Sequence, residues 1–111
     1  MVKYIPQKGD FVIVNFNPQS GHEQQGRRPA LVISNNAFNQ KMGLAIVCPI
    51  TNTDRKIPFH IQVQSNKLSG FIMTEQVKSI DYKTRQIKFV DNAKTQTIRQ
   101  VLAIINSVLN T

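Results

Sequence analysis

The chain has 111 residues, with fourteen Lys and Arg against six Asp and Glu, so its formal net charge is +8. This length predicts one domain over residues 1–111. The apolar runs are too short for a membrane span, and no signal peptide pattern is present. We therefore expect a cytoplasmic protein whose charge attracts a polyanion such as RNA, or an acidic protein, rather than a membrane.

A charged loop between two strands is the first predicted feature. Apolar runs over 10–16 and 30–34 are typical of strands. Between them, residues 21–30 read GHEQQGRRPA and bring together an imidazole, a carboxylate and two guanidiniums. Loops held by a sheet often carry function. A solvated hairpin tip would have a similar composition, so both interpretations stay open.

The rest of the chain predicts short strands followed by a helix. Strands are expected over 44–50, 58–63, 71–74 and 86–90, separated by polar connections over 35–43, 51–56, 65–70 and 81–85. Such short, closely spaced strands indicate a small barrel or rolled sheet. Apolar residues over 98–109 then recur every three or four positions, which predicts an amphipathic helix capped by Thr95 or Thr97. The expected fold class is mainly β with a C-terminal helix.

Metal and cofactor sites are not indicated by the sequence. Cys48 is the only cysteine and lies in an apolar run, so we expect a buried, reduced thiol. His22 and His60 are far apart, and His60 is expected to face solvent from its strand. No nucleophile elbow or glycine-rich phosphate loop occurs. We expect no metal and no cofactor.

Phosphodiester cleavage is the chemistry that the remaining polar residues suit. RNA carries its own nucleophile, the ribose 2′-hydroxyl, so cleavage needs a base and donors to the phosphate oxygens. Arg28 offers a fixed fork of donors. Glu23 is the more natural base, and His22 the less natural one. Thr51 is either a donor to phosphate or an ordinary turn cap.

A family resemblance is carried by three motifs and the C-terminal helix. The motifs are GDFVIVNFNPQSGHEQQGRRPALVIS, CPIT and EQVKSID. Together they closely resemble the MazF/PemK toxins of type II toxin-antitoxin systems, over almost the whole chain. The resemblance implies an SH3-like barrel that forms a homodimer and cuts single-stranded mRNA at short sequences without a metal. The products would carry 2′,3′-cyclic phosphate and 5′-hydroxyl ends, and growth would stop.

The same resemblance implies site residues and a protein partner. By position, Arg28 and Thr51 match the family's catalytic arginine and threonine, and Glu23 matches its acidic loop residue. Glu75 stands where many members have Asp, and Arg27 stands where a relative has His. The partner would be an acidic MazE/PemI-like antitoxin whose disordered tail covers Arg28. The RNA-binding residues expected are His22, Gln24, Arg27, Asn52, Arg55, Lys56 and Gln76.

Two other functions stay open on the sequence alone. The same barrel class supports CcdB-like toxins that poison DNA gyrase without chemistry and would use the C-terminal helix. A basic RNA-binding module without catalysis is the second. For base stacking, Phe38 and Tyr82 are candidates while Phe16 is expected in the core, and the 35–43 loop could close over substrate.

Overall fold

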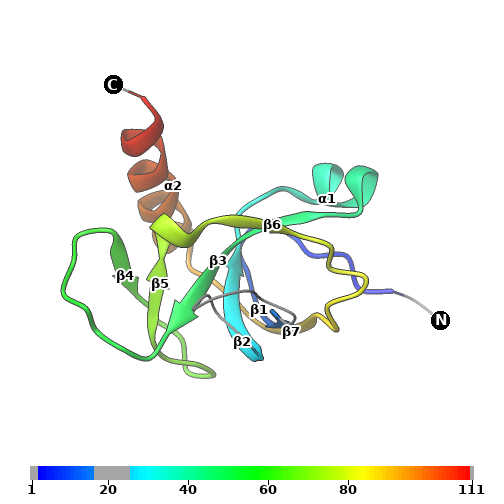
Figure 1. Cartoon of the computed structure of the whole chain (residues 1–111), viewed down its shortest axis with the longest axis horizontal. Coiled ribbons are helices and arrows are strands. Elements are labelled where there is room, and N and C mark those ends of the chain that lie inside the picture. The colour runs from blue at the N-terminus through cyan, green and yellow to red at the C-terminus, as the bar shows by residue number, and fades with distance from the viewer. Residues whose placement is uncertain (1–2, 17–25, 111) are drawn as a thin grey trace.

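The computed structural model describes residues 3–16 and 26–110. The elements in chain order are β1 (Asp10–Asn15), β2 (Arg27–Val32), α1 (Asn36–Met42), β3 (Ala45–Thr51), β4 (His60–Gln62), β5 (Phe71–Met73), the 3-10 helix η1 (Thr74–Gln76), β6 (Lys78–Ile80), β7 (Lys88–Asn92) and α2 (Thr95–Leu109). Figure 1 shows that the strands form a curled sheet with α2 outside it. Over the ranges described, neither helix is long and apolar enough to cross a membrane.

The sheet is antiparallel and β3 lies at its centre. The strand order is β4-β5-β3-β2-β1-β7, and β6 also pairs with β3. One edge of β3 pairs with β2, while the other pairs first with β6 and then with β5. The predicted fold class, mainly β with a C-terminal helix, is confirmed.

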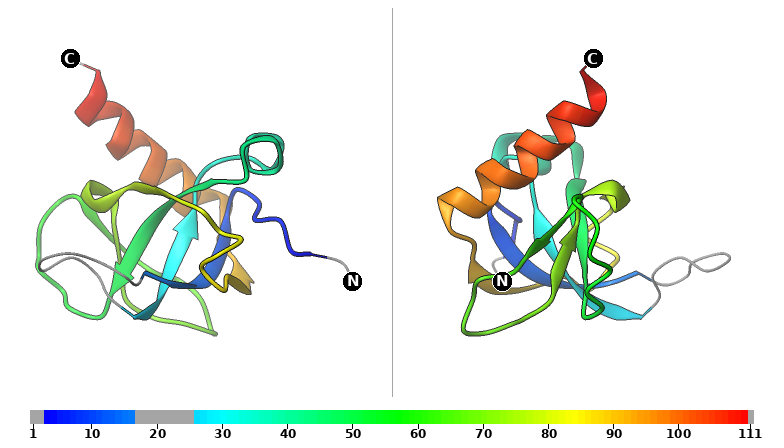
Figure 2. Two further views of the ribbon diagram at one scale, coloured as in Figure 1. Left: turned by 45° about the vertical axis from the view of Figure 1, so that its right-hand side comes forward. Right: turned by 90° about the vertical axis from the view of Figure 1, so that its left-hand side faces the viewer.

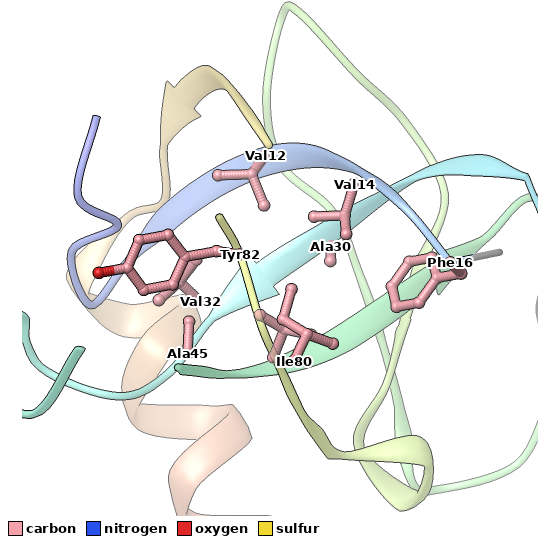
Figure 3. Close-up of a cluster of buried hydrophobic side chains, with 9 residues drawn as sticks. Val12, Val14, Phe16, Ala30, Val32, Ala45, Ile80 and Tyr82 are labelled. Atoms are coloured by element: carbon pink, nitrogen blue, oxygen red, sulfur yellow. The ribbon is translucent and has the colours of Figure 1, made fainter. Parts of the chain in front are cut away.

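Apolar side chains are buried on both faces of this sheet. The first cluster contains Val12, Val14, Phe16, Ala30, Val32, Ala45, Val47, Ile80 and Tyr82. Figure 3 shows it with Tyr82 at one end and Phe16 at the other. The second cluster contains Phe11, Leu31, Cys48, Ile50, Val63, Ile72 and Val101. Successive residues of a strand point to opposite faces, so the unbroken apolar runs of β1, β2 and β3 fill both clusters.

One side of helix α2 packs on the second cluster. Val101 is fully buried there and Ile105 packs against it, while Val108 and Leu109 stay largely exposed. Figure 2 shows α2 running obliquely across the strands and ending beyond them. The predicted cap is wrong, because the N-cap residue is Lys94, no side chain caps the helix, and Thr97 is buried within it.

The predicted loop over 35–43 is wrong, since most of it forms α1. The side-chain oxygen of Asn35 accepts the N–H of Phe38 at 2.8 Å, and Gly43 ends the helix at a φ of 69°. Asn39 is buried and donates to the carbonyl oxygens of Pro6 and Ser34. These bonds hold α1 against the N-terminal segment.

Two smaller predictions also differ from the structure. His60 does not face solvent, because its side chain is only 3% exposed and its Nε2 lies 2.9 Å from a carboxylate oxygen of Glu75. Strand β6 was not predicted, since three residues give too short a pattern. The buried positions of Phe16 and Cys48 are confirmed.

Candidate active site

Arg28 and Thr51 come from neighbouring strands and share one face of the sheet. Between β2 and β3, Ala30 pairs with Pro49 and Val32 with Val47. Continued for two residues, this register places Arg28 level with Thr51. The alternation of strand side chains puts both on the face of the first cluster, to which Ala30 and Val47 belong. The two residues predicted to be catalytic therefore share one face, at the end of that cluster.

Thr51 is held in place by its own hydroxyl and by a glycine. It is buried, and its Oγ1 accepts the N–H of Thr53 at 3.2 Å. This is the turn cap that the sequence allowed, yet the hydroxyl hydrogen remains available for donation to another acceptor. Gly70 lies against the strand end, where a Cβ would stand 2.7 Å from the Thr51 carbonyl oxygen. A glycine there lets β5 pair with Thr51.

Arg27 and Arg28 are adjacent in sequence but belong to opposite faces of β2. Arg27 is exposed, and its guanidinium donates to the backbone oxygen of Gln86 at 3.0 Å. Gln86 has a φ of 53°, a conformation that a residue with a side chain rarely adopts. The structure therefore fixes Arg27 on the connection before β7 rather than beside Thr51.

The loop after Thr51 is positively charged and solvated. Asn52, Arg55 and Lys56 are exposed. Lys56 has a φ of 55°, and its N–H donates to the side chain of Asp54 at 3.0 Å. The loop thus has a defined turn at its tip.

Gln76 ends η1 on the connection that runs along the edge of β3. Preceding it, Thr74 donates from both its N–H and its hydroxyl to the carbonyl oxygen of Phe59. Glu75 then bonds to His60, whose Nδ1 is buried with no partner in the described part of the chain. These contacts fix η1 to the start of β4 and hold half-buried Gln76 between β5 and β6.

Three predicted residues, His22, Glu23 and Gln24, lie outside the described residues. Over residues 3–16 and 26–110, no three His, Cys, Asp or Glu side chains gather to hold a metal ion. Burial, and to a smaller extent the charge of Glu75, raises the pKa of Cys48 to about 12. The thiol is therefore uncharged near neutral pH and a poor nucleophile.

Sequence reasoning missed two residues that shape the site, Gly70 and Gln86. The Ser-Gly pair before β5 is a recognisable turn signal, and it could have identified Gly70. Gln86 has no such signal, because nothing in a glutamine indicates a positive φ. Its role emerges only from the bond it accepts from Arg27.

Comparison with known proteins identifies the family. The model of the PemK-like, MazF-like toxins of type II toxin-antitoxin systems matches residues 7–109. The endoribonuclease toxin MazF of Escherichia coli K12 is 31% identical over 107 residues, covering 96% of each chain. A crystal structure of MazF from Deinococcus radiodurans superposes with a TM-score of 0.91 at 34% identity, covering 98% of this chain and 100% of that one.

A MazE-MazF complex from Deinococcus radiodurans is also similar, with a TM-score of 0.86 at 29% identity, covering 98% of this chain and 99% of the matched chain. The chain therefore belongs to the PemK-like, MazF-like toxin family. The predicted resemblance is confirmed.

Proposed function

We propose that this chain is a sequence-specific, metal-independent endoribonuclease toxin that cleaves single-stranded mRNA and stops translation and growth. The observation that carries the proposal is the shared face of Arg28 and Thr51, set by the β2–β3 register. It occurs in a chain whose family includes relatives named as endoribonuclease toxins. We treat residues 1–111 as one toxin domain.

The reaction follows from the chemistry of RNA. Glu23, as base, takes the proton of the ribose 2′-hydroxyl, and the 2′-oxygen attacks the adjacent phosphorus. The bond from phosphorus to the 5′-oxygen breaks, and that oxygen takes a proton from water and leaves as a hydroxyl. The other product is a 2′,3′-cyclic phosphate. Arg28 stabilises the charge that builds on the phosphate oxygens, and Thr51 donates one hydrogen bond to them.

RNA contacts outside this pair are proposed for two loops and η1. The residues are His22, Gln24, Arg27, Asn52, Arg55, Lys56 and Gln76. Asn52, Arg55 and Lys56 are exposed directly after Thr51, which supports a role in guiding the backbone. Arg27 would contact RNA from the opposite face of β2, because its bond to Gln86 holds its guanidinium away from the face that carries Thr51.

The proposed protein partner is an acidic antitoxin similar to MazE or PemI. Support comes from the net charge of +8 and from the similarity to the toxin chain of a MazE-MazF complex. A flexible acidic tail bound over Arg28 would block RNA both sterically and electrostatically. We place this pair in the bacterial cytoplasm, where mRNA and a reducing environment for Cys48 coexist.

A homodimer is proposed because the end of α2 and its surroundings leave an apolar surface uncovered. Phe59, Val77, Val108 and Leu109 are exposed large hydrophobic residues around a hollow of about 250 Å³. A second copy of the chain would bury this surface. Sedimentation at micromolar concentration tests it, since a monomeric mass would refute the dimer.

The gyrase-poison alternative is not favoured, because the matching family model and curated relatives are those of the MazF and PemK toxins. The non-catalytic alternative predicts equal binding to RNA and to a 2′-deoxy analogue, with both left intact. Neither alternative uses the Arg28 and Thr51 pair for bond cleavage.

The deciding experiment incubates the purified protein with a long single-stranded RNA in excess EDTA and maps the fragment ends. We expect discrete cuts with cyclic-phosphate and 5′-hydroxyl ends. A matched RNA with a single 2′-deoxy nucleotide at the mapped position should resist cutting there and nowhere else. Intact RNA, or cutting at the deoxy position, would refute the proposed reaction.

A further inference from the structure

Lys78 is a cation on the same face of the sheet as Arg28 and Thr51. It begins β6 and pairs directly with Val47 of β3, and two residues later Ile80 pairs with Ala45. Val47, Ala45 and Ile80 all belong to the first cluster. Because directly paired residues share a face, the side chain of Lys78 stands on that face too.

The side chain of Lys78 reaches toward the end of the cluster where Arg28 lies. Its ammonium nitrogen is 5.4 Å from the centre of the Phe16 ring. Phe16 is fully buried at one end of the cluster (Figure 3), and its N–H donates to Gly26, two residues before Arg28. Val14, on the same face as Phe16, pairs with Arg28. The Phe16 ring is therefore close both to the Lys78 ammonium and to the start of the strand that carries Arg28.

Lys78 is half-buried, and its ammonium makes no ion pair with a carboxylate of the described residues. The single ion pair among residues 3–16 and 26–110 joins His60 to Glu75, so no described carboxylate neutralises Lys78. The face of an aromatic ring attracts a cation within about 6 Å but leaves its N–H donors unused. A positioned ammonium with unused donors is suited to a phosphate, which it meets as a point charge.

We propose that Lys78 is a further substrate-binding residue, whose ammonium holds an RNA phosphate beside the Arg28 and Thr51 pair. This inference rests on the proposed function, because it assigns Lys78 to the substrate of that same site. Phe16 acts as the positioning residue that orients the ammonium. The plain alternative is that Lys78 only covers the Phe16 ring and makes no contact with RNA.

The test measures RNA affinity as a function of salt for Lys78→Met, which keeps an unbranched stem and removes the charge. The ligand is the RNA that carries a 2′-deoxy nucleotide at the mapped cleavage position. Lys88→Met is the matched control, because Lys88 is exposed on the far strand β7, where it pairs with Ile13 of β1. Lys78→Arg keeps the charge, and thermal melts of all three variants report on folding.

We expect Lys78→Met to weaken binding about 10-fold and to lower the salt slope by about 0.7, the value for one phosphate contact on a single strand. Lys88→Met should stay within about 2-fold, and Lys78→Arg should keep the slope. Equal slopes for Lys78→Met and the wild type would overturn the inference. If the wild type binds RNA but cuts none, the proposed reaction fails while the slope still decides the role of Lys78.

Discussion

The two faces of the curled sheet are built from the same strands but carry different residues beyond their buried clusters. On the face of the first cluster, the strands carry Arg28, Thr51 and Lys78, and the Lys78 ammonium lies over the buried Phe16 ring. On the opposite face, α2 covers the second cluster, and the surface beyond it stays apolar. The comparison teaches that the alternation of side chains along each strand separates the proposed catalytic residues from the residues that pack against α2.

The largest effect is expected at Arg28, because we propose that it stabilises the charge that builds on the phosphate oxygens. Arg28→Ala should lower the single-turnover cleavage rate about 10²–10³-fold with little change in melting temperature. Arg99→Ala, on the exposed side of α2, removes the same charge and serves as the control. Similar rates for both variants would show that Arg28 contributes only net charge.

Gly70→Ala tests whether the position of Thr51 depends on the glycine beside it. The new Cβ would stand 2.7 Å from the Thr51 carbonyl oxygen, and the φ of 132° already disfavours a side chain. We expect a loss of about 1–3 kcal/mol in the free energy of unfolding, together with a slower cleavage rate.

Gly43→Ala is the control for Gly70→Ala. Gly43 also has a positive φ, but a Cβ added there would contact only the flexible end of the Lys83 side chain. This variant should destabilise the fold without slowing cleavage by folded protein. A Gly70→Ala variant with the wild-type rate would break the link between this glycine and Thr51.

Val101→Ala tests the packing face. Val101 is fully buried in the second cluster, so we expect a loss of about 1–2 kcal/mol in unfolding free energy from the lost contacts and the cavity. Chemical denaturation measures the loss, with Gln100→Ala at an exposed neighbouring position as control. The cleavage rate per folded molecule should not change, and a large drop would mean that the two faces are coupled.

Near neutral pH the smallest effect is the pH dependence contributed by Cys48, because it develops only above pH 9. Its pKa in the folded protein is about 12, above the ordinary value of 9.0, so the fold favours the neutral thiol. The contribution of the neutral thiol to the free energy of unfolding is complete below pH 9 and is lost as the pH rises toward 12. The stability advantage of the wild type over Cys48→Ala should therefore shrink by about 1 kcal/mol for each pH unit above 9. A constant difference would contradict this.

Long apolar runs made much of the fold predictable. The runs over β1 and β3 and the helical period of α2 are strong local patterns, and all three elements are present. Helix α1 was missed because its stability comes from tertiary bonds of buried Asn39, which leave no apolar period in the sequence. Strand β6 was missed because its pairing with β3 determines it more than its three residues do.

The candidate site was predictable as a set of residues but not as a geometry. The motifs RRPA and CPIT pointed to Arg28 and Thr51, yet their shared face depends on the β2–β3 register, which the sequence does not reveal. Grouping Arg27 with Arg28 overlooked strand alternation. The bond from Arg27 to Gln86 further depends on an unusual backbone conformation of the glutamine.

The central claim, that Arg28 and Thr51 act on one phosphate, is tested most directly by a double-mutant cycle of single-turnover cleavage rates. The variants are Arg28→Ala, Thr51→Val and the combination, with Thr51→Ser to show that a hydroxyl suffices. Residues that share one transition-state charge should show a coupling energy of about 1 kcal/mol or more. Strictly additive losses would contradict the account, because they would mean that the two side chains act on separate parts of the substrate.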